Sequence, residues 1–274
     1  MRKITFLLAT TIFYLFIGCT QEIPIEYLSM DLDQNSIQSN RIVLPNEIPG
    51  IEVEHVALIG DESKIETQEM GFKNIFLFIK GQGIAEAGNE RFNLVPESIL
   101  LPNNLNSISI NVSKNDTLHY LKISSALTEQ DLLDLKEFPK ENTERVYFKA
   151  FIDCESYTEP IKSPKTVSRT VLPNQIIPRI AMETVETLGP DKVQAHEHPM
   201  LEQLFLGLTN NEVTVFADDA KIDFPAYSVL HIPLGSSHSV EVGDNKKMYY
   251  MWMDFFKDKK GEEWLKTHNT VEEE

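Results

Sequence analysis

Three histidines and a glutamate occur in this sequence at spacings that suit a metal site. His196 and His198 are separated by one residue, Glu202 follows His198 by four, and His238 comes after a Pro-x-Gly turn. Alternate side chains of a strand share a face, so His196 and His198 would point the same way, about 7 Å apart. Glu202 shares that face if the strand continues unbroken, and a returning antiparallel strand would bring His238 opposite. The pattern predicts a metal site.

The donor set limits the metal without identifying it. Three imidazoles and a carboxylate suit one divalent transition metal, and Zn, Mn, Fe, Ni and Cu all remain open. Gln203 adjoins Glu202 but has the opposite parity, so it is not expected to bind the metal. The alternative is a set of ordinary surface histidines. Four of the seven histidines in the chain fall within residues 196–238, which favours the metal site.

Four further residues are candidates for work beside the metal. His231 could act as an acid–base residue, or it could be a core or surface histidine. Arg179, on the strand before the first histidine, is a candidate anchor for a substrate carboxylate, against the alternative of an exposed arginine. Tyr250 and Trp252 share one face of the last strand and could stack on a substrate, although core packing is the more common role of such aromatics.

Composition limits the class of partner. The chain has 274 residues, enough for two domains or one large all-β unit. Its formal charge of −17 argues against nucleic acid, because no basic stripe could neutralise phosphates. A small-molecule ligand is therefore expected. If that ligand is anionic, a bound cation would supply the positive centre it needs.

The N-terminus resembles the signal of a bacterial lipoprotein. Two basic residues precede an apolar run, residues 4–17, that is short for a membrane span. The run ends in Leu-Phe-Ile-Gly-Cys19, which resembles a lipobox, although phenylalanine stands where leucine is usual. The resemblance implies removal of residues 1–18, lipidation of Cys19, export, and a membrane anchor facing the periplasm or cell surface. A plain secretion signal and an uncleaved anchor are the alternatives.

The elements that must position these residues are short strands in two regions. Alternating and apolar runs of strand length fill residues 51–123 and about 167–256, with one more run at 145–152, and Gly, Pro and Asn turns separate them. Between them, Thr128 precedes Asp131 by three residues, an N-cap signal, and Pro139 ends the segment. One short helix with a leucine-rich apolar side is predicted there.

The two histidine motifs together resemble those of the cupin superfamily. That family has His-x-His followed by Glu and Gly, and then Pro-x-Gly followed by His, as residues 196–207 and 233–238 do here. The resemblance carries over His196, His198, Glu202 and His238 as ligands. It implies an all-β fold of two tandem cupin barrels, each a jelly roll, with a metal at the barrel mouth and a homodimer as one option.

The first strand region looks like a degenerate copy of the same barrel. Counting back and forward by the spacings of the second copy reaches Met70, Phe72, Phe76 and Ser107 in place of ligands, so no metal is expected there. The resulting division of the chain is a signal peptide at 1–18, a tether that may end in a first strand at 19–45, a degenerate N-terminal cupin domain at 46–126, a connector with a short helix at 127–165, a metal-binding C-terminal cupin domain at 166–256 and a charged tail at 257–274.

Two classes of function follow from this resemblance. The first is an extracytoplasmic metal-dependent enzyme of isomerase or lyase type, in which the metal acts as Lewis acid on a small oxygen-rich metabolite such as a sugar acid. An Fe-dependent dioxygenase is the enzymatic alternative. The second class is a non-catalytic lipoprotein that binds a small ligand or carbohydrate through its metal. The fold alone does not select among them.

Overall fold

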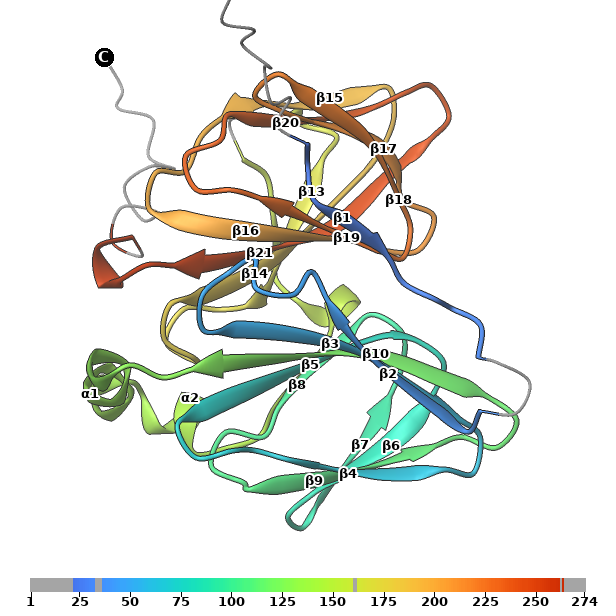
Figure 1. Cartoon of the computed structure of the whole chain (residues 1–274), viewed down its shortest axis with the longest axis vertical. Coiled ribbons are helices and arrows are strands. Elements are labelled where there is room, and N and C mark those ends of the chain that lie inside the picture. The colour runs from blue at the N-terminus through green and yellow to red at the C-terminus, as the bar shows by residue number, and fades with distance from the viewer. Residues whose placement is uncertain (1–21, 33–35, 160–161, 262, 264–274) are drawn as a thin grey trace, which may run out of the picture.

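The computed structural model describes residues 22–32, 36–159, 162–261 and 263 of the chain. Over these residues the chain forms two barrels, one above the other in Figure 1, each made of one large and one small antiparallel sheet. The predicted all-β class with two tandem barrels is confirmed. The export signal, Cys19 and most of the charged tail lie outside the described residues. None of the described helices is long and apolar enough to span a membrane.

The N-terminal barrel combines a six-stranded and a four-stranded sheet. The six-stranded sheet has the order β11 (Tyr147–Ala150), β8 (Ser98–Leu101), β5 (Phe72–Lys80), β10 (Thr117–Ala126), β3 (Ile51–Ile59), β2 (Gln38–Val43). The four-stranded sheet has the order β4 (Ser63–Thr67), β9 (Ser107–Val112), β6 (Gly83–Ala87), β7 (Glu90–Leu94). Large side chains fill the space between the sheets, among them Phe76, Phe78 and Tyr120. Met70, one of the positions matched to a ligand, is instead 99% exposed.

The C-terminal barrel repeats this plan. Its seven-stranded sheet has the order β1 (Ile25–Tyr27), β19 (Ser228–Ile232), β16 (Leu201–Gly207), β21 (Lys247–Phe256), β14 (Ile180–Leu188), β13 (Val167–Leu172), β12 (Ser156–Tyr157). Its four-stranded sheet has the order β15 (Asp191–His196), β20 (His238–Val242), β17 (Glu212–Ala217), β18 (Ala220–Pro225).

The two large sheets pack face to face, so their central strands are buried on both sides. In β16, Leu204 and Leu206 join the core between the barrels, whereas Phe205 points into the C-terminal barrel. In β21, Met251 lies in the core between the barrels and Tyr250 lies inside the barrel. Since successive side chains of a strand point to opposite faces, parity alone decides whether a residue of β16 or β21 reaches the barrel interior.

The segment expected to be a tether is part of the fold over its described residues. β1 pairs with β19 of the C-terminal barrel, and Ile23 just before it is buried in the core of that barrel. β2 then pairs with β3 of the N-terminal barrel. The tether assignment for 19–45 is therefore corrected at β1, whereas β2 is a strand at its end, where one was expected; the two strands complete the edges of the two large sheets (Figure 1).

The connector holds the predicted helix, α1 (Glu129–Glu137), followed by the short α2 (Lys140–Thr143) and a 3-10 turn, η1 (Phe151–Asp153). Thr128 caps α1 and forms a capping box with Asp131, as its sequence signal indicated. The apolar side did not follow the prediction, because Leu132 and Leu133 are about half exposed. The buried residues of the helix are Asp131 and Asp134.

Arg179 explains why α1 buries an aspartate. Its guanidinium donates from Nε and Nη2 to the two carboxylate oxygens of Asp131, each at 2.8 Å. It also donates to the backbone oxygens of Ala126 and Phe256, at 3.2 and 3.3 Å. Burial by itself would raise the pKa of Asp131, but the hydrogen bonds from Arg179 and Thr128 outweigh it and hold that pKa below its usual value. Arg179 thus fastens the connector to the end of the C-terminal barrel.

Replacing Arg179 should therefore destabilise the fold. Arg179→Gln leaves the buried Asp131 carboxylate without its partner, so the free energy of unfolding in urea should fall by about 3 kcal/mol. Arg91→Gln is the matched control, because Arg91 is 67% exposed in an ion pair with Glu86 and should cost under about 1 kcal/mol. Equal urea midpoints for Arg179→Gln and the wild type would refute the anchoring role.

Candidate metal centre

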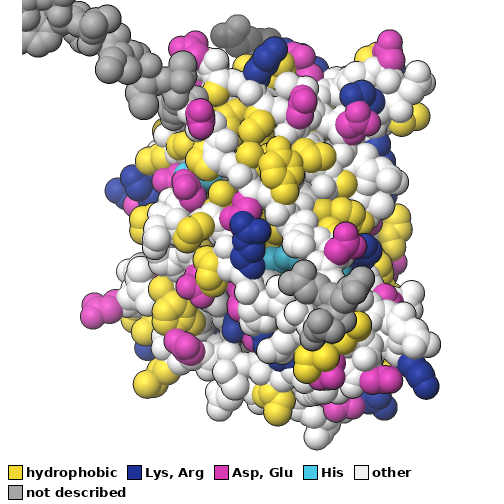
Figure 2. All heavy atoms as spheres, turned by 45° about the vertical axis from the view of Figure 1, so that its right-hand side comes forward, with side chains coloured by type: hydrophobic (Ala, Val, Ile, Leu, Met, Phe, Trp, Pro, Cys, Tyr) yellow, Lys and Arg dark blue, Asp and Glu magenta, His cyan; other side chains and the backbone are white. Residues whose placement is uncertain are grey.

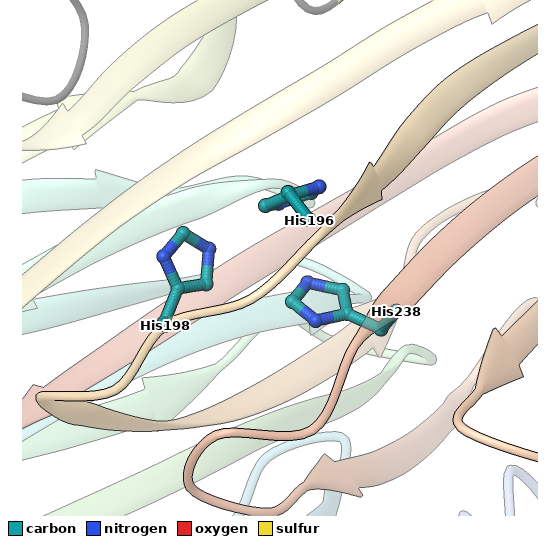
Figure 3. Close-up of side chains that lie close together, drawn as sticks. All are labelled: His196, His198 and His238. Carbon is teal, nitrogen blue, oxygen red and sulfur yellow. The ribbon is translucent and has the colours of Figure 1, made fainter.

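Three of the four predicted ligands lie together at one end of the C-terminal barrel. His196 ends β15, His198 follows in the loop, and His238 opens β20 directly across the ladder from His196. Figure 3 shows the three rings gathered from these two chain segments. One ring nitrogen from each lies within 4.8 Å of the others. Two nitrogens on opposite sides of one zinc-like ion are about 4 Å apart, so the cluster is close to the span of a metal site.

Local hydrogen bonds prepare two of the rings for a metal. Nδ1–H of His196 donates to the backbone oxygen of Gln194 at 2.7 Å, and Nδ1–H of His238 donates to that of Ser236 at 3.2 Å. A carbonyl oxygen can only accept, so Nε2 of each ring is left with its lone pair. His238 is 2% exposed, and burial together with the neighbouring His196 lowers its pKa to about 3. The neutral imidazole of His238 fits a divalent metal.

The cluster lies at a cavity inside the barrel. The cavity has roughly 70 Å³ open to the centre of a water-sized molecule, within roughly 650 Å³ of empty space that includes open solvent. The polar residues that line it beside the three histidines come from the two large-sheet strands β14 and β21, from β16, and from the segment around β12. They are Glu183, Asp254, Gln203, Tyr157, Glu159 and Lys162.

Glu202, predicted as the fourth ligand, lies on the other side of the sheet. Its Oε2 accepts a hydrogen bond from the backbone N–H of Leu234 at 2.8 Å and lies 3.1 Å from Nε2 of His231. The strand that starts at Asp191 ends at His196 and a new one begins at Leu201. Parity counted across that break does not hold, and the assignment of Glu202 is corrected. Pro199, which cannot donate to a strand ladder, was the available signal of the break.

Gln203 takes the place expected of Glu202. It is 4% exposed and lines the cavity with the histidines. Its Nε2 donates to Oδ1 of Asp254 at 2.7 Å, across the β16–β21 ladder, which directs the amide. Its Oε1 is buried and has no hydrogen-bond partner among the described residues. An amide oxygen held in this way is a candidate fourth donor.

Two carboxyl groups in the cavity differ from ordinary surface acids. Burial, reinforced by the charge of Asp254, raises the pKa of Glu183 to about 8. Burial also raises the pKa of Asp254 to about 7, against the hydrogen bond from Gln203. Oε2 of Glu183 is buried without a hydrogen-bond partner among the described residues. Both groups therefore exchange protons near neutral pH, as groups in reactive sites often do.

Comparisons with known proteins agree with this architecture. No protein-family model and no curated protein matches the sequence. Solved structures do match: a cupin 2 conserved barrel domain protein from Leptotrichia buccalis, with 14% identity and a TM-score of 0.60, covers 87% of this chain and 99% of its own. Oxalate decarboxylase from Bacillus subtilis, with 12% identity and a TM-score of 0.61, covers 87% and 77%. Protein Ylba from E. coli, with 13% identity and a TM-score of 0.62, covers 85% and 90%.

The chain has the cupin fold. Within this fold, the cluster of His196, His198 and His238 lies in the second barrel. On the face drawn in Figure 2, acidic and basic side chains are scattered among hydrophobic ones, and no continuous basic stripe crosses its described part.

The remaining predicted site residues separate into two groups. Tyr250 and Trp252 line the cavity of the cupin barrel, on the face where their parity put them. His231 lies on the opposite face of the sheet, between Glu47 at 2.8 Å and Glu202 at 3.1 Å. Arg179 lies outside the cavity, fastened to Asp131. The structure thus brings neither His231 nor Arg179 to the cavity.

The sequence carried signals for the acids that were missed. Glu183 stands in the otherwise apolar strand start IAMET, and Asp254 interrupts the apolar run MYYMWMDFF. In strands buried on both faces, a charged residue must be paired or functional, because burying an unpaired charge is costly. Lys162 and Glu159 form an ion pair and line the cavity, but they lie outside the strands, where parity gives no signal.

The raised pKa of Glu183 has a measurable effect on stability. Between about pH 4.5 and pH 8 the folded metal-free protein keeps a proton that the unfolded chain has released, so raising the pH across this window costs stability. Glu183→Gln removes this cost. The difference in free energy of unfolding between Glu183→Gln and the wild type should hardly change with pH below pH 4.5. Between pH 4.5 and pH 8.5 it should rise in favour of the variant by on the order of a few kcal/mol.

Thermal or urea unfolding of the metal-free proteins at several pH values measures this difference. Glu186→Gln is the matched control on the same strand, because Glu186 points to the other face and pairs with Lys247. It should show no such rise with pH. If the difference in free energy of unfolding between Glu183→Gln and the wild type stays constant from pH 4.5 to 8.5, the raised pKa of Glu183 is contradicted.

Proposed function

We propose that this cupin is a metal-dependent enzyme acting on a small oxygen-rich metabolite, with chemistry of the isomerase or lyase type. The observation that carries the proposal is the cluster of three imidazoles at the cavity of the second barrel. Two of these imidazoles have the tautomer that a metal needs. Among the fold neighbours, oxalate decarboxylase is an enzyme, which adds support without extending its substrate to this chain.

The residues that would hold the ion are His196, His198 and His238, and Gln203 Oε1 would be the fourth protein donor. Asp254 would keep the Gln203 amide turned toward the ion through its hydrogen bond with Nε2. A bound divalent ion supplies Lewis-acid polarisation of a substrate oxygen. Glu183 faces the same cavity and is the residue best placed to take up or release a proton, at Oε2.

The first barrel offers an internal comparison that favours catalysis over simple binding. Its buried carboxylate, Glu66, is 4% exposed and has three partners: Tyr120 at 2.6 Å, Lys64 at 2.9 Å and Lys122 at 3.0 Å. Burial would raise the pKa of Glu66, but these partners hold it below its usual value. Among the described residues, Glu183 has no comparable set of partners. The buried acid of the first barrel is thus held by hydrogen bonds and ion pairs, whereas Glu183 lines the cavity with the histidines and has an unbonded oxygen.

Metal analysis of purified residues 20–274 tests the assignment. The wild type should bind about one divalent ion per chain, and His196→Ala and His238→Ala should bind almost none. Gln203→Ala or Asp254→Asn should weaken metal affinity by about 10- to 100-fold, the usual effect of residues that orient ligands. Glu202→Gln is the matched control and should keep wild-type affinity. Equal metal content in all variants would sink the proposal.

A substrate screen with the Zn, Mn and Fe forms separates the remaining readings. Isomerisation or elimination without oxygen uptake supports the proposal, whereas oxygen uptake with the Fe form would favour a dioxygenase. A ligand that raises the melting temperature of the loaded protein without being turned over would favour a metal-dependent binding protein.

The location that we propose is the outer side of a bacterial membrane, with a lipid anchor on Cys19. The support is the charge-then-apolar order of the N-terminus and its Leu-Phe-Ile-Gly-Cys ending. Cys19→Ser should remove the anchor, so the full-length protein should leave the membrane fraction or stay unprocessed. Labelling with a radioactive or alkyne-tagged fatty acid should mark the wild type alone. Equal labelling of both proteins would contradict lipidation at Cys19.

A further inference from the structure

We propose that the cavity of the second barrel takes an uncharged, polyhydroxylated small molecule, such as a sugar or a cyclic polyol, and discriminates against the corresponding carboxylic acid. This narrows the proposed function, on which it rests for the location of the ligand. It departs from the expectation of a sugar acid, and from the anionic substrate named by the oxalate decarboxylase neighbour.

The charge balance of the cavity is the first argument. Three acidic side chains line it, Glu159, Glu183 and Asp254, against one basic side chain, Lys162. When all are ionised the balance is −2, which a divalent ion would offset without leaving any net positive charge. The described lining residues include no arginine, the usual partner of a substrate carboxylate.

The single cation is already engaged. Lys162 is 9% exposed, and its Nζ forms an ion pair with Glu159 and donates to Oγ of Ser168 at 2.9 Å. Glu159 accepts a second hydrogen bond, from Ser168 Oγ at 3.0 Å. To meet a substrate carboxylate, Lys162 would have to leave Glu159 behind as a buried unpaired charge, which is costly. Among the described side chains that line the cavity, an anionic ligand therefore finds no ready partner.

Hydroxyl groups of a ligand match the polar lining of the cavity better than positively or negatively charged ligand groups do. Oε2 of Glu183 is buried and has no hydrogen-bond partner among the described residues, and a buried polar atom left in that state is costly. A hydroxyl can both donate and accept, so it satisfies Glu183 whether the carboxyl is ionised or holds a proton. A ligand carboxylate can only accept, so above about pH 8, where Glu183 is ionised, the two carboxylates would repel each other.

An aromatic side chain adjoins this acceptor. Trp252 lies directly across the β14–β21 ladder from Glu183, and both line the cavity. Tyr250, one pleat further along the same face of β21, lines the cavity as well. A sugar or polyol ring presents an apolar C–H face beside its hydroxyls, which suits an aromatic wall next to a carboxyl group. Such lining and such a ligand are complementary.

Matched pairs of hexoses and uronates test the proposal directly. Glucose with glucuronate, galactose with galacturonate, and mannose with mannuronate differ only at C6, where a hydroxymethyl group is replaced by a carboxylate. Calorimetric titration at pH 9, where Glu183 is ionised, on both the metal-free and the metal-loaded protein, should find at least one hexose that binds. Its uronate should bind at least tenfold more weakly.

Variants locate the cause of the preference. Glu183→Gln keeps hydrogen-bonding capacity but removes the carboxyl group, so hexose affinity should stay within about threefold while the preference over the uronate falls to under about threefold. The control is Glu186→Gln, on the opposite face of the same strand, which should keep the full preference.

The outcomes separate this proposal from the proposed function. A uronate that binds as tightly as its hexose, or no binding by any member of the three pairs, overturns the assignment of ligand class. Metal content, measured on the same samples, is independent of that result. Hexose preference in a protein that binds no metal would leave this inference standing and remove the metal-dependent enzyme.

Discussion

The structure depends on strands that are buried on both faces. The large sheets of the two barrels pack against each other, so β14, β16 and β21 have one face in the core between the barrels and the other inside the second barrel. In the middle of these strands, no face is left for ordinary solvent-exposed charges. A polar side chain there must find its hydrogen-bond partner either inside the barrel or in the core between the barrels. The parity of its position along the strand decides which of the two it faces. The cavity chemistry and the contact between barrels are set by the same alternation.

This constraint explains how far the sequence could predict the site. His196, His198 and His238 were found because their spacing stays within single strands or the loop that directly continues one. The placement of the fourth donor failed because the chain turns between His198 and Leu201, which resets the parity and exchanges Glu202 for its neighbour Gln203. A period-2 argument is valid only along an uninterrupted strand, and a proline was the mark of the interruption.

Other features depend on contacts between residues far apart in the sequence, and single-sequence patterns do not contain these. Arg179 is engaged by a carboxylate 48 positions earlier, on a helix whose exposed leucines look like its packing face. β1 joins a strand about 200 residues later, so a short polar segment reads as a tether until its partner is known. The strand periodicity rests on local alternation and turns, and it was predicted. The two barrels were implied by the resemblance to cupins, and the partners that complete the sheet edges were not predicted.

The two barrels show how one fold holds either a packed interior or a reactive cavity. In the first, the rings of Phe76 and Phe78 each contact the Tyr120 ring in a tilted arrangement, with ring centroids 6.0 and 5.6 Å apart, and help to fill the interior. In the second, Phe205 contacts Tyr250 at 5.0 Å and His238 at 5.8 Å, so the aromatic core stops at the histidines. Beyond that point polar side chains line the cavity. Among them are Glu183 and Asp254, whose pKa values burial raises to about 8 and about 7. An apolar floor that desolvates those acids also shifts their proton affinities, so packing and reactivity in the second barrel have a common cause.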